Sequence, residues 1–251
     1  WIAAHEIREV RQWGVLRTGD ETPVGPDSLF EACSMTKPLF AYAVLKLAEE
    51  GALDLHRPLV EVLGRPYLED DERHRRITPW MVLTHSSGLP NWREGGRTSP
   101  RPPELRFEPG TGTLYSGEGY WFLQRAVEHL TGVGLDRLMQ ERLLQPLGMA
   151  ASSLVWLPAC AAKAASGHNA TGEPHADRAL FTEPNAAFSL YTTPGDYARF
   201  LLEMMKRDRS APHSLSAPMV NWMLTRHRPL DGVASIQRRG PRKSTTAYTG
   251  L

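Results

Sequence analysis

Apolar residues at helical spacing form the strongest pattern in this sequence. After Ser34, side chains three and four positions apart share one helix face: Leu39, Phe40, Ala43, Val44 and Leu47. Gly51 follows where a glycine commonly ends a helix. The pattern therefore predicts a helix that starts near Ser34 and ends before Gly51.

Four more helices are predicted from the same spacing and from residues that favour helix starts. Thr78 followed by Pro79 starts a short helix. Amphipathic stretches cover residues 119–130 and 135–144, and Thr193 with Pro194 starts another stretch that runs to Met204. The middle of the chain is therefore expected to be mainly helical.

Strand signal is confined to the two ends of the chain. Residues 7–16 carry Val10, Trp13 and Val15 between charged residues, and turn residues follow at 18–27. The signal is weak between about 55 and 190 and returns faintly towards the C-terminal end. We therefore expect an α+β fold in which residues 1–62 and 206–251 form a sheet domain and residues 63–205 form a mainly helical domain.

Composition narrows the class of protein. The 251 residues include 29 Lys and Arg against 28 Asp and Glu, a formal charge of +1 that gives no basic surface for nucleic acid. No apolar run approaches the ~20 residues of a membrane span. We expect a globular protein with a small-molecule partner. The first ten residues lack the apolar core of a signal peptide, which leaves a cytoplasmic and a mature periplasmic or secreted location open.

Ser34 and Lys37 form a Ser-x-x-Lys motif at the start of the first predicted helix. Positions i and i+3 share a helix face, so the amine of Lys37 is expected beside the Ser34 hydroxyl. A serine becomes nucleophilic when a base takes its proton, and burial lowers the pKa of a lysine towards neutrality. The alternative is that Ser34 only caps the helix and Lys37 is a surface charge.

Tyr115 lies in a turn-rich stretch directly before the helix predicted at 119–130. A tyrosine beside a Ser/Lys pair can pass a proton between nucleophile and leaving group, and we expect the adjacent lysine to acidify its phenol. The alternative role for a loop tyrosine is packing.

Five segments together resemble the serine β-lactamase and penicillin-binding-protein superfamily. They are similar to its class C-like branch, which includes family VIII carboxylesterases and D-Ala-D-Ala carboxypeptidases, in both order and spacing: residues 29–59, 77–92, 107–132, 143–149 and 184–205. The resemblance implies Ser34 as nucleophile, Lys37 as its partner and Tyr115 as the second-box proton shuttle. It also implies a β-lactamase/transpeptidase-like fold, an antiparallel sheet flanked by helices plus a mainly helical domain, with no metal or organic cofactor.

The chain departs from this family at two motifs. Gly117 stands where the second box, Tyr-x-Asn, has an amide that would bind the acyl amide of a lactam or peptide. The third box, Lys/His-Thr-Gly, has only a degenerate match in Tyr248, Thr249 and Gly250, for which a frayed tail is the alternative. Loss of one oxyanion donor costs roughly 10²- to 10³-fold in rate. We therefore expect weak activity if the chain is complete, and a truncated chain is the alternative.

The favoured hypothesis is a serine hydrolase that forms an acyl-enzyme on small carboxylic esters. The alternatives are β-lactam or D-Ala-D-Ala peptide hydrolysis, and a catalytically impaired, β-lactamase-like binding protein. Gly117 and residues 248–250 are expected to contact substrate, and Trp92, with Trp80 and Trp121, either lines an acyl pocket or packs in the core. His85 is expected to be structural. The loop with His168, His175 and Asp177 is a weak candidate for a metal site.

Overall fold

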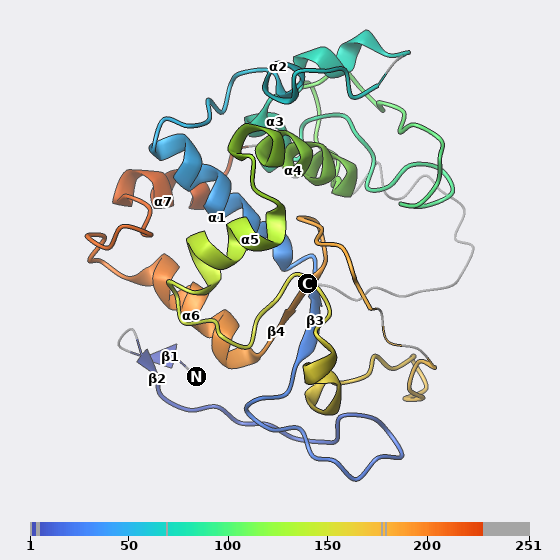
Figure 1. The fold of residues 1–251 in the computed structure, drawn as a ribbon, viewed down its shortest axis with the longest axis vertical. Helices are drawn as coiled ribbons and strands as arrows, with labels where there is room; N and C mark the ends of the chain where they lie inside the picture. Colours follow the sequence, from blue (N-terminus) through green and yellow to red (C-terminus); the bar gives the residue numbers. More distant parts are fainter. Residues whose placement is uncertain (1, 4–5, 69, 177, 179, 228–251) are drawn as a thin grey trace.

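The computed structural model describes residues 2–3, 6–68, 70–176, 178 and 180–227 (Figure 1). Its elements follow in the order β1 (Ile2–Ala3), β2 (Glu6–Ile7), β3 (Phe30–Cys33), α1 (Thr36–Glu49), α2 (Leu59–Leu63), η1 (Glu72–Arg76), α3 (Pro79–Leu83), α4 (Gly117–Thr131), α5 (Leu135–Met139), η2 (Gln140–Leu144), η3 (Pro158–Lys163), β4 (Leu190–Thr192), α6 (Pro194–Met205) and α7 (Ala217–Leu224).

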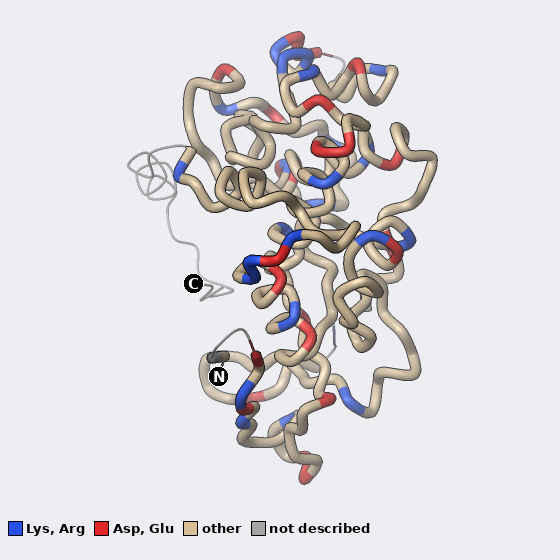
Figure 2. Tube along the Cα trace, turned by 90° about the vertical axis from the view of Figure 1, so that its left-hand side faces the viewer, with Lys and Arg blue, Asp and Glu red and all other residues tan. Residues whose placement is uncertain are grey.

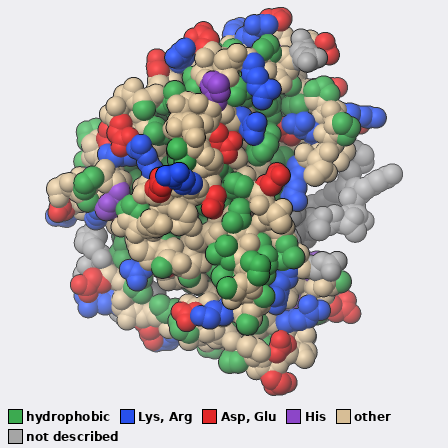
Figure 3. All heavy atoms as spheres, in the orientation of Figure 1, with side chains coloured by type: hydrophobic (Ala, Val, Ile, Leu, Met, Phe, Trp, Pro, Cys, Tyr) green, Lys and Arg blue, Asp and Glu red, His purple; other side chains and the backbone are tan. Residues whose placement is uncertain are grey.

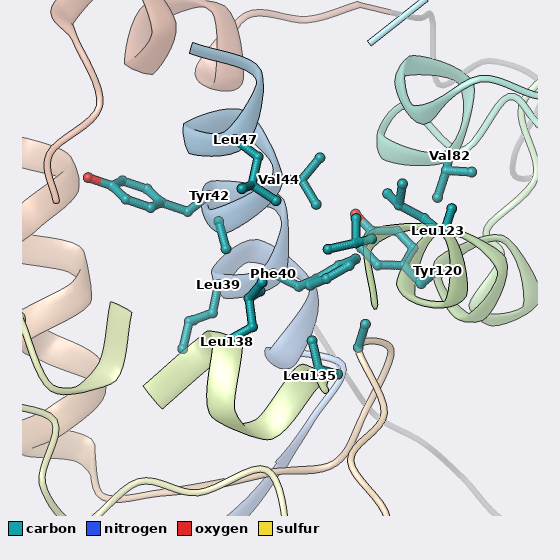
Figure 4. Packing of buried hydrophobic residues seen from close by; sticks show 14 of the residues in the cluster. Leu39, Phe40, Tyr42, Val44, Leu47, Val82, Tyr120, Leu123, Leu135 and Leu138 are labelled. Carbon is teal, nitrogen blue, oxygen red and sulfur yellow. The ribbon is translucent and has the colours of Figure 1, made fainter. Parts of the chain in front are cut away.

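Helix α1 lies at the centre of the molecule, between α4, α5 and α7 (Figure 1). Its side chains are buried on nearly every face, as expected of a helix that is apolar all round. Phe40 is fully buried and contacts the ring of Tyr120 on α4, with ring centroids 6.2 Å apart. Figure 4 shows Phe40 of α1 pointing towards Tyr120 of α4, while Tyr42 points to the opposite side of the helix, where it contacts Phe200 of α6. This packing holds the start of α1, and the residues just before it, in a fixed place.

Strands β3 and β4 form an antiparallel pair. Strand β3 leads into α1, and β4 leads into α6. Phe30 lies opposite Thr192, and the register shifts between Glu31 and Cys33, so that Cys33 lies opposite Leu190. An irregularity of this kind turns a strand locally and re-aims the side chains that follow it. Here the next residue along the chain is Ser34.

The predicted helices are confirmed, and their caps explain where they begin. The Thr78 and Thr193 side chains accept hydrogen bonds from the amides of Met81 and Asp196 at the starts of α3 and α6. Helix α4 starts at Gly117, slightly before the predicted 119, because Ser116 is its cap. The stretch predicted at 135–144 is α5 followed by a π-helical turn.

One strand prediction is wrong. The strand expected at 7–16 ends at Ile7 with β2, and Val10, Trp13 and Val15 are exposed rather than buried on one face. Alternating apolar residues form a strand only where one face is covered, and nothing described covers them here. The strand signal expected at the C-terminal end falls mainly on residues 228–251, outside the described residues, and the described part before them contains α7, which starts with a Ser216 cap and Pro218.

The fold class is the expected α+β, with helices predominating and short antiparallel strand pairs. One hydrophobic cluster joins residues from α1, α4, α5, α6 and α7, so the described core is continuous across the boundaries predicted at 62/63 and 205/206. The division into two domains stays a prediction.

Charges of both signs are interspersed along the trace and over the visible surface (Figures 2 and 3). This mixture agrees with the formal charge of +1. Among the described helices, none has the length and apolar character needed to cross a bilayer.

Candidate active site

Ser34 lies in the two-residue turn between β3 and α1, and its side chain is exposed. Helix α1 begins at Thr36, its cap is Met35, and no side chain hydrogen bonds to the first amides. The capping role considered for Ser34 is therefore wrong. Its hydroxyl is free for other partners at an accessible position.

The backbone of Cys33 turns the chain into this position. Cys33 has φ of 46°, a left-handed conformation that side-chain-bearing residues rarely adopt. Thr36 holds it there, because its hydroxyl donates to the Cys33 carbonyl at 2.6 Å and accepts from the Leu190 amide at 3.0 Å. Burial raises the pKa of the Cys33 thiol, so the thiol stays protonated beside Ser34.

Lys37 is buried directly beneath Ser34. Its Nζ lies 3.3 Å from Ser34 Oγ and donates to the Ala187 carbonyl at 2.7 Å. Only 5% of the residue is exposed, and no carboxylate of the described chain pairs with it. Burial lowers the pKa of Lys37 to about 8. The surface-charge alternative is wrong. The amine is still mostly protonated at neutral pH, but it loses its proton far more readily than an exposed lysine does.

Tyr115 completes the cluster, because its hydroxyl hydrogen bonds to Ser34. The expected acidification by lysine is wrong. Burial raises the pKa of Tyr115 above its usual value, and the bond to Ser34 opposes this only in part. Lys37 Nζ lies over the ring face, 4.6 Å from the centroid, so its charge stabilises the ring as a cation–π partner rather than a phenolate oxygen. Tyr115 is therefore protonated at neutral pH.

Residues 85–91 hold the Tyr115 segment in place through hydrogen bonds on both sides of the tyrosine. The Leu114 amide donates to the His85 carbonyl at 2.8 Å, and the Ser116 amide donates to His85 Nδ1 at 3.2 Å. The Ser116 hydroxyl donates to the Pro90 carbonyl at 2.9 Å. His85 was expected to be structural, and in the structure it supports the segment that carries Tyr115.

His85 is neutral in this position. Burial, and then the charge of Lys37, lower its pKa to about 4. Because Nδ1 accepts from the Ser116 amide, the ring proton belongs on Nε2. The imidazole also packs against the Tyr115 ring, with centroids 4.6 Å apart, and its own backbone has φ of 53°.

Gly117 is required by Trp92. A Cβ on Gly117 would lie 2.6 Å from Cη2 of Trp92 and 2.8 Å from the Asn91 carbonyl oxygen. The same carbonyl oxygen accepts a hydrogen bond from the Gly117 amide at 3.0 Å. Real Cβ atoms do not approach that closely. The indole thus occupies the space where the second-box amide of the resembling family would begin.

A buried ion pair anchors the loop that carries Trp92. Arg93 donates to both carboxylate oxygens of Glu118, at 2.9 and 2.8 Å, and Tyr67 donates to the same carboxylate at 3.1 Å. Glu118 follows Gly117 directly and is buried. Two-pronged pairing of this kind fixes orientation as well as distance.

Of the three tryptophans considered for an acyl pocket, only Trp92 borders the cluster. Its ring meets Phe188 edge-on at 5.4 Å, and Phe188 follows Ala187, the carbonyl partner of Lys37. Trp80 lies against His56, with centroids 6.2 Å apart, and Trp121 lies against Arg125.

Sequence reasoning missed the Ala187 carbonyl and Phe188. A backbone oxygen carries no residue-type signal, and the resemblance of segment 184–205 gave no role to its aromatic residues. The signal available for Phe188 was an aromatic residue between the small residues Ala187 and Ser189.

Comparison with known proteins identifies the family of the chain. The profile of the Beta-lactamase family matches residues 3–235. The chain belongs to this family. Lovastatin esterase of Penicillium rubens is 32% identical over 166 residues, covering 53% of this chain and 41% of that protein. Penicillin-binding protein 4 of Amycolatopsis lactamdurans is 31% identical over 147 residues, covering 54% of this chain and 39% of that protein.

Solved structures share the β-lactamase fold. The crystal structure of a penicillin-binding protein from Bacillus halodurans superposes with a TM-score of 0.71 at 21% identity, covering 88% of this chain and 72% of that one. The chain spans about two fifths of the length of the curated family relatives described above.

The other sequence-based candidates are the third-box residues and the loop that carries His168. Tyr248, Thr249 and Gly250 fall outside the described residues. His168 Nε2 accepts from the Thr18 amide at 3.0 Å, and within the described part of this β-lactamase-family chain no three His, Cys, Asp or Glu side chains form a metal site. Asp177 is also outside the described residues.

A hollow of about 600 Å³ lies at the other end of α1, against α7, and is lined mainly by apolar groups including Leu55, Met219 and Trp222. At 1.5 Å per residue α1 is about 20 Å long, which separates this hollow from Ser34. Its one serine, Ser216, uses its hydroxyl to cap α7. The chemistry of Ser34, Lys37 and Tyr115 therefore identifies the candidate site better than the size of a hollow does.

We predict that Gly117→Ala destabilises the protein by about 1–3 kcal/mol, because the new methyl group overlaps the Trp92 ring. Urea unfolding measures the change. Gly134→Ala is the matched control, since its Cβ would meet nothing within 4 Å. Adding Trp92→Ala should make the Gly117→Ala cost smaller, and an undiminished cost would contradict the proposed contact.

We also predict that His85→Leu lowers the free energy of unfolding by about 2 kcal/mol or more, because it leaves the Ser116 amide unpaired and a branched residue at positive φ. His85→Asn keeps an acceptor and tolerates positive φ, so it should cost less than half as much. Equal losses in chemical denaturation would show that neither feature matters.

Proposed function

We propose that this chain carries the active site of a serine hydrolase that forms a covalent acyl-enzyme and prefers small carboxylic esters. The observation that carries the proposal is the buried, unpaired amine of Lys37, 3.3 Å from the accessible Ser34 hydroxyl. A lysine in that setting is a base rather than a fixed cation.

In acylation, neutral Lys37 takes the proton of Ser34 as Oγ attacks the carbonyl carbon of the ester. Tyr115, protonated at neutral pH, donates its proton to the leaving alkoxide oxygen, and the alcohol departs. Lys37 then returns the proton it took to Tyr115. The acyl group remains on Ser34 as an ester, and the three side chains regain their starting protonation.

Deacylation uses the same groups. Neutral Lys37 accepts a proton from a water molecule that attacks the acyl carbon. The resulting ammonium of Lys37 then returns that proton to Ser34 Oγ as Oγ leaves. The product is the free acid. No step requires a metal ion.

The oxyanion that forms in both steps needs a backbone N–H donor near Ser34. The Met35 and Lys37 amides are already bonded to the carbonyls of Ala32 and Ser34. We therefore assign the role of oxyanion donor to the amide of Ser34 itself. A second donor from the third box, Thr249 with Gly250, remains part of the proposal.

Gly117 supports esters over amides. A side-chain amide that would bind the N–H of a lactam or peptide has no space beside Trp92, and an ester lacks that N–H. The similarity to lovastatin esterase agrees with this preference. The similarity to penicillin-binding protein 4 favours a second candidate, hydrolysis of a β-lactam or D-Ala-D-Ala peptide.

We predict that the protein hydrolyses p-nitrophenyl butyrate faster than nitrocefin and that Ser34→Ala lowers ester turnover at least about 100-fold. Release of p-nitrophenol and labelling of Ser34 by a fluorophosphonate are the measurements. Ser210→Ala, an exposed serine far along the chain, is the control. Faster nitrocefin turnover would favour the second candidate, and no labelling of Ser34 would favour an impaired binding protein.

We predict that kcat/KM for the ester rises with pH up to about 8, because Lys37 must lose its proton to act as base. The same depressed pKa affects stability. Between about 8 and 10.5 the native state binds fewer protons than the unfolded state, so the free energy of unfolding should rise with pH there. Lys37→Met should abolish both dependences, and an acidic limb centred near the usual pKa of histidine would contradict the role of Lys37.

A further inference from the structure

Arg97 covers two aromatic rings beside the candidate site. Its guanidinium carbon lies 4.6 Å from the ring centroid of Phe188 and 5.3 Å from that of Phe181. The residue is exposed, and no ion pair joins it to an acid in the part of the chain that the structure describes. A guanidinium stacked on rings keeps its edge N–H donors free, in the geometry that fits a carboxylate.

The aromatic surface under Arg97 is continuous with the supports of the Ser34 cluster. Phe188 follows Ala187, whose carbonyl accepts from Lys37 at 2.7 Å. Trp92 meets Phe188 edge-on and fills the space above Gly117, two residues after Tyr115. A substrate at Ser34 thus has an apolar surface of Trp92 and Phe188 beside it, with Arg97 at its exposed end.

Neighbouring charges of the same loop are already neutralised. Arg93 pairs with buried Glu118, and Arg101 pairs with Glu94 at 3.0 Å. Arg97 is therefore the charge of this loop that remains available to a ligand, within the described residues. A single cation on an aromatic surface attracts an anion that also carries apolar groups.

We propose that the site takes esters that carry a carboxylate, with the apolar part of the substrate on Trp92 and Phe188 and the carboxylate on Arg97. This inference rests on the proposed esterase function and names its substrate class. The chain of contacts from Lys37 through Ala187 and Phe188 to Arg97 places the carboxylate on the order of 10 Å from the ester carbonyl. An aliphatic spacer of several methylenes or an aromatic ring covers that distance.

Two matched pairs of esters test the proposal. In one pair the anion is in the acyl part: the mono-p-nitrophenyl ester of octanedioic acid against p-nitrophenyl octanoate. In the other it is in the alcohol part: the butyrate ester of 4-hydroxybenzoate against that of 4-hydroxyacetophenone. The readout is the ratio of kcat/KM for the charged ester to that for the neutral one, in the wild type, Arg97→Gln and Arg101→Gln.

We expect Arg97→Gln to lower this ratio about five- to tenfold in at least one pair, as loss of a charge-assisted contact at an exposed site should. Arg101→Gln should leave the ratio unchanged, because Arg101 is paired with Glu94. Raising salt to about 0.5 M should lower the wild-type ratio, since exposed charges are screened. Ratios that are the same in Arg97→Gln and the wild type, in both pairs, would overturn the proposal.

A separate measurement distinguishes this failure from failure of the esterase proposal. If the wild type turns over none of the four esters, the proposed function is overturned, and binding of the octanedioate ester to Ser34→Ala then decides the anion site. Calorimetry should show weaker binding when Arg97→Gln is added. Equal binding by the two variants would overturn the anion site as well.

Discussion

The burial of one lysine without a counter-charge is the constraint on which the site depends. Removing an ammonium from water is costly unless the amine gives up its proton or finds compensating partners. Lys37 has a carbonyl, a hydroxyl and the faces of two tyrosine rings around it, but no described carboxylate. This environment disfavours the ammonium form and lowers the pKa of Lys37 to about 8. It also explains why the neighbouring Tyr115 and His85 remain uncharged at neutral pH, because burial disfavours ionisation of all three groups.

The rest of the fold keeps that environment in place. Helix α1 is packed on nearly all sides, so Lys37 cannot leave the core without breaking the packing around Phe40. Segments far apart in sequence meet at its first turn. Residues 85–91 hold the Tyr115 segment, and the strand pair β3–β4 brings Ala187 beneath the amine. The same contacts place Trp92 against Gly117, where a Cβ would overlap the indole ring. This packing leaves no space for a side chain at residue 117 and forms an aromatic surface of Trp92 and Phe188.

Local patterns in the sequence predicted much of this. Helical spacing located α1 and α4, cap residues such as Thr78 located helix starts, and the spacing of Ser34 and Lys37 predicted their contact. The failures share a cause. The strand expected at 7–16 required a partner surface, and the acidity expected of Tyr115 required knowing which part of the ring faces Lys37. The Ala187 carbonyl and the position of Arg97 over Phe188 arise from tertiary contacts that no local pattern encodes.

The charge state of Lys37 is the quantity that tests this account most directly. Proton titration of lysine ¹³Cε resonances by NMR, with the Lys37 signal assigned as the one missing from Lys37→Met, measures its pKa without reference to any substrate. The account predicts a midpoint of about 8. A midpoint near the ordinary value of about 10.4 for an exposed lysine would contradict it, because Ser34 would then lie beside a permanent cation rather than a base.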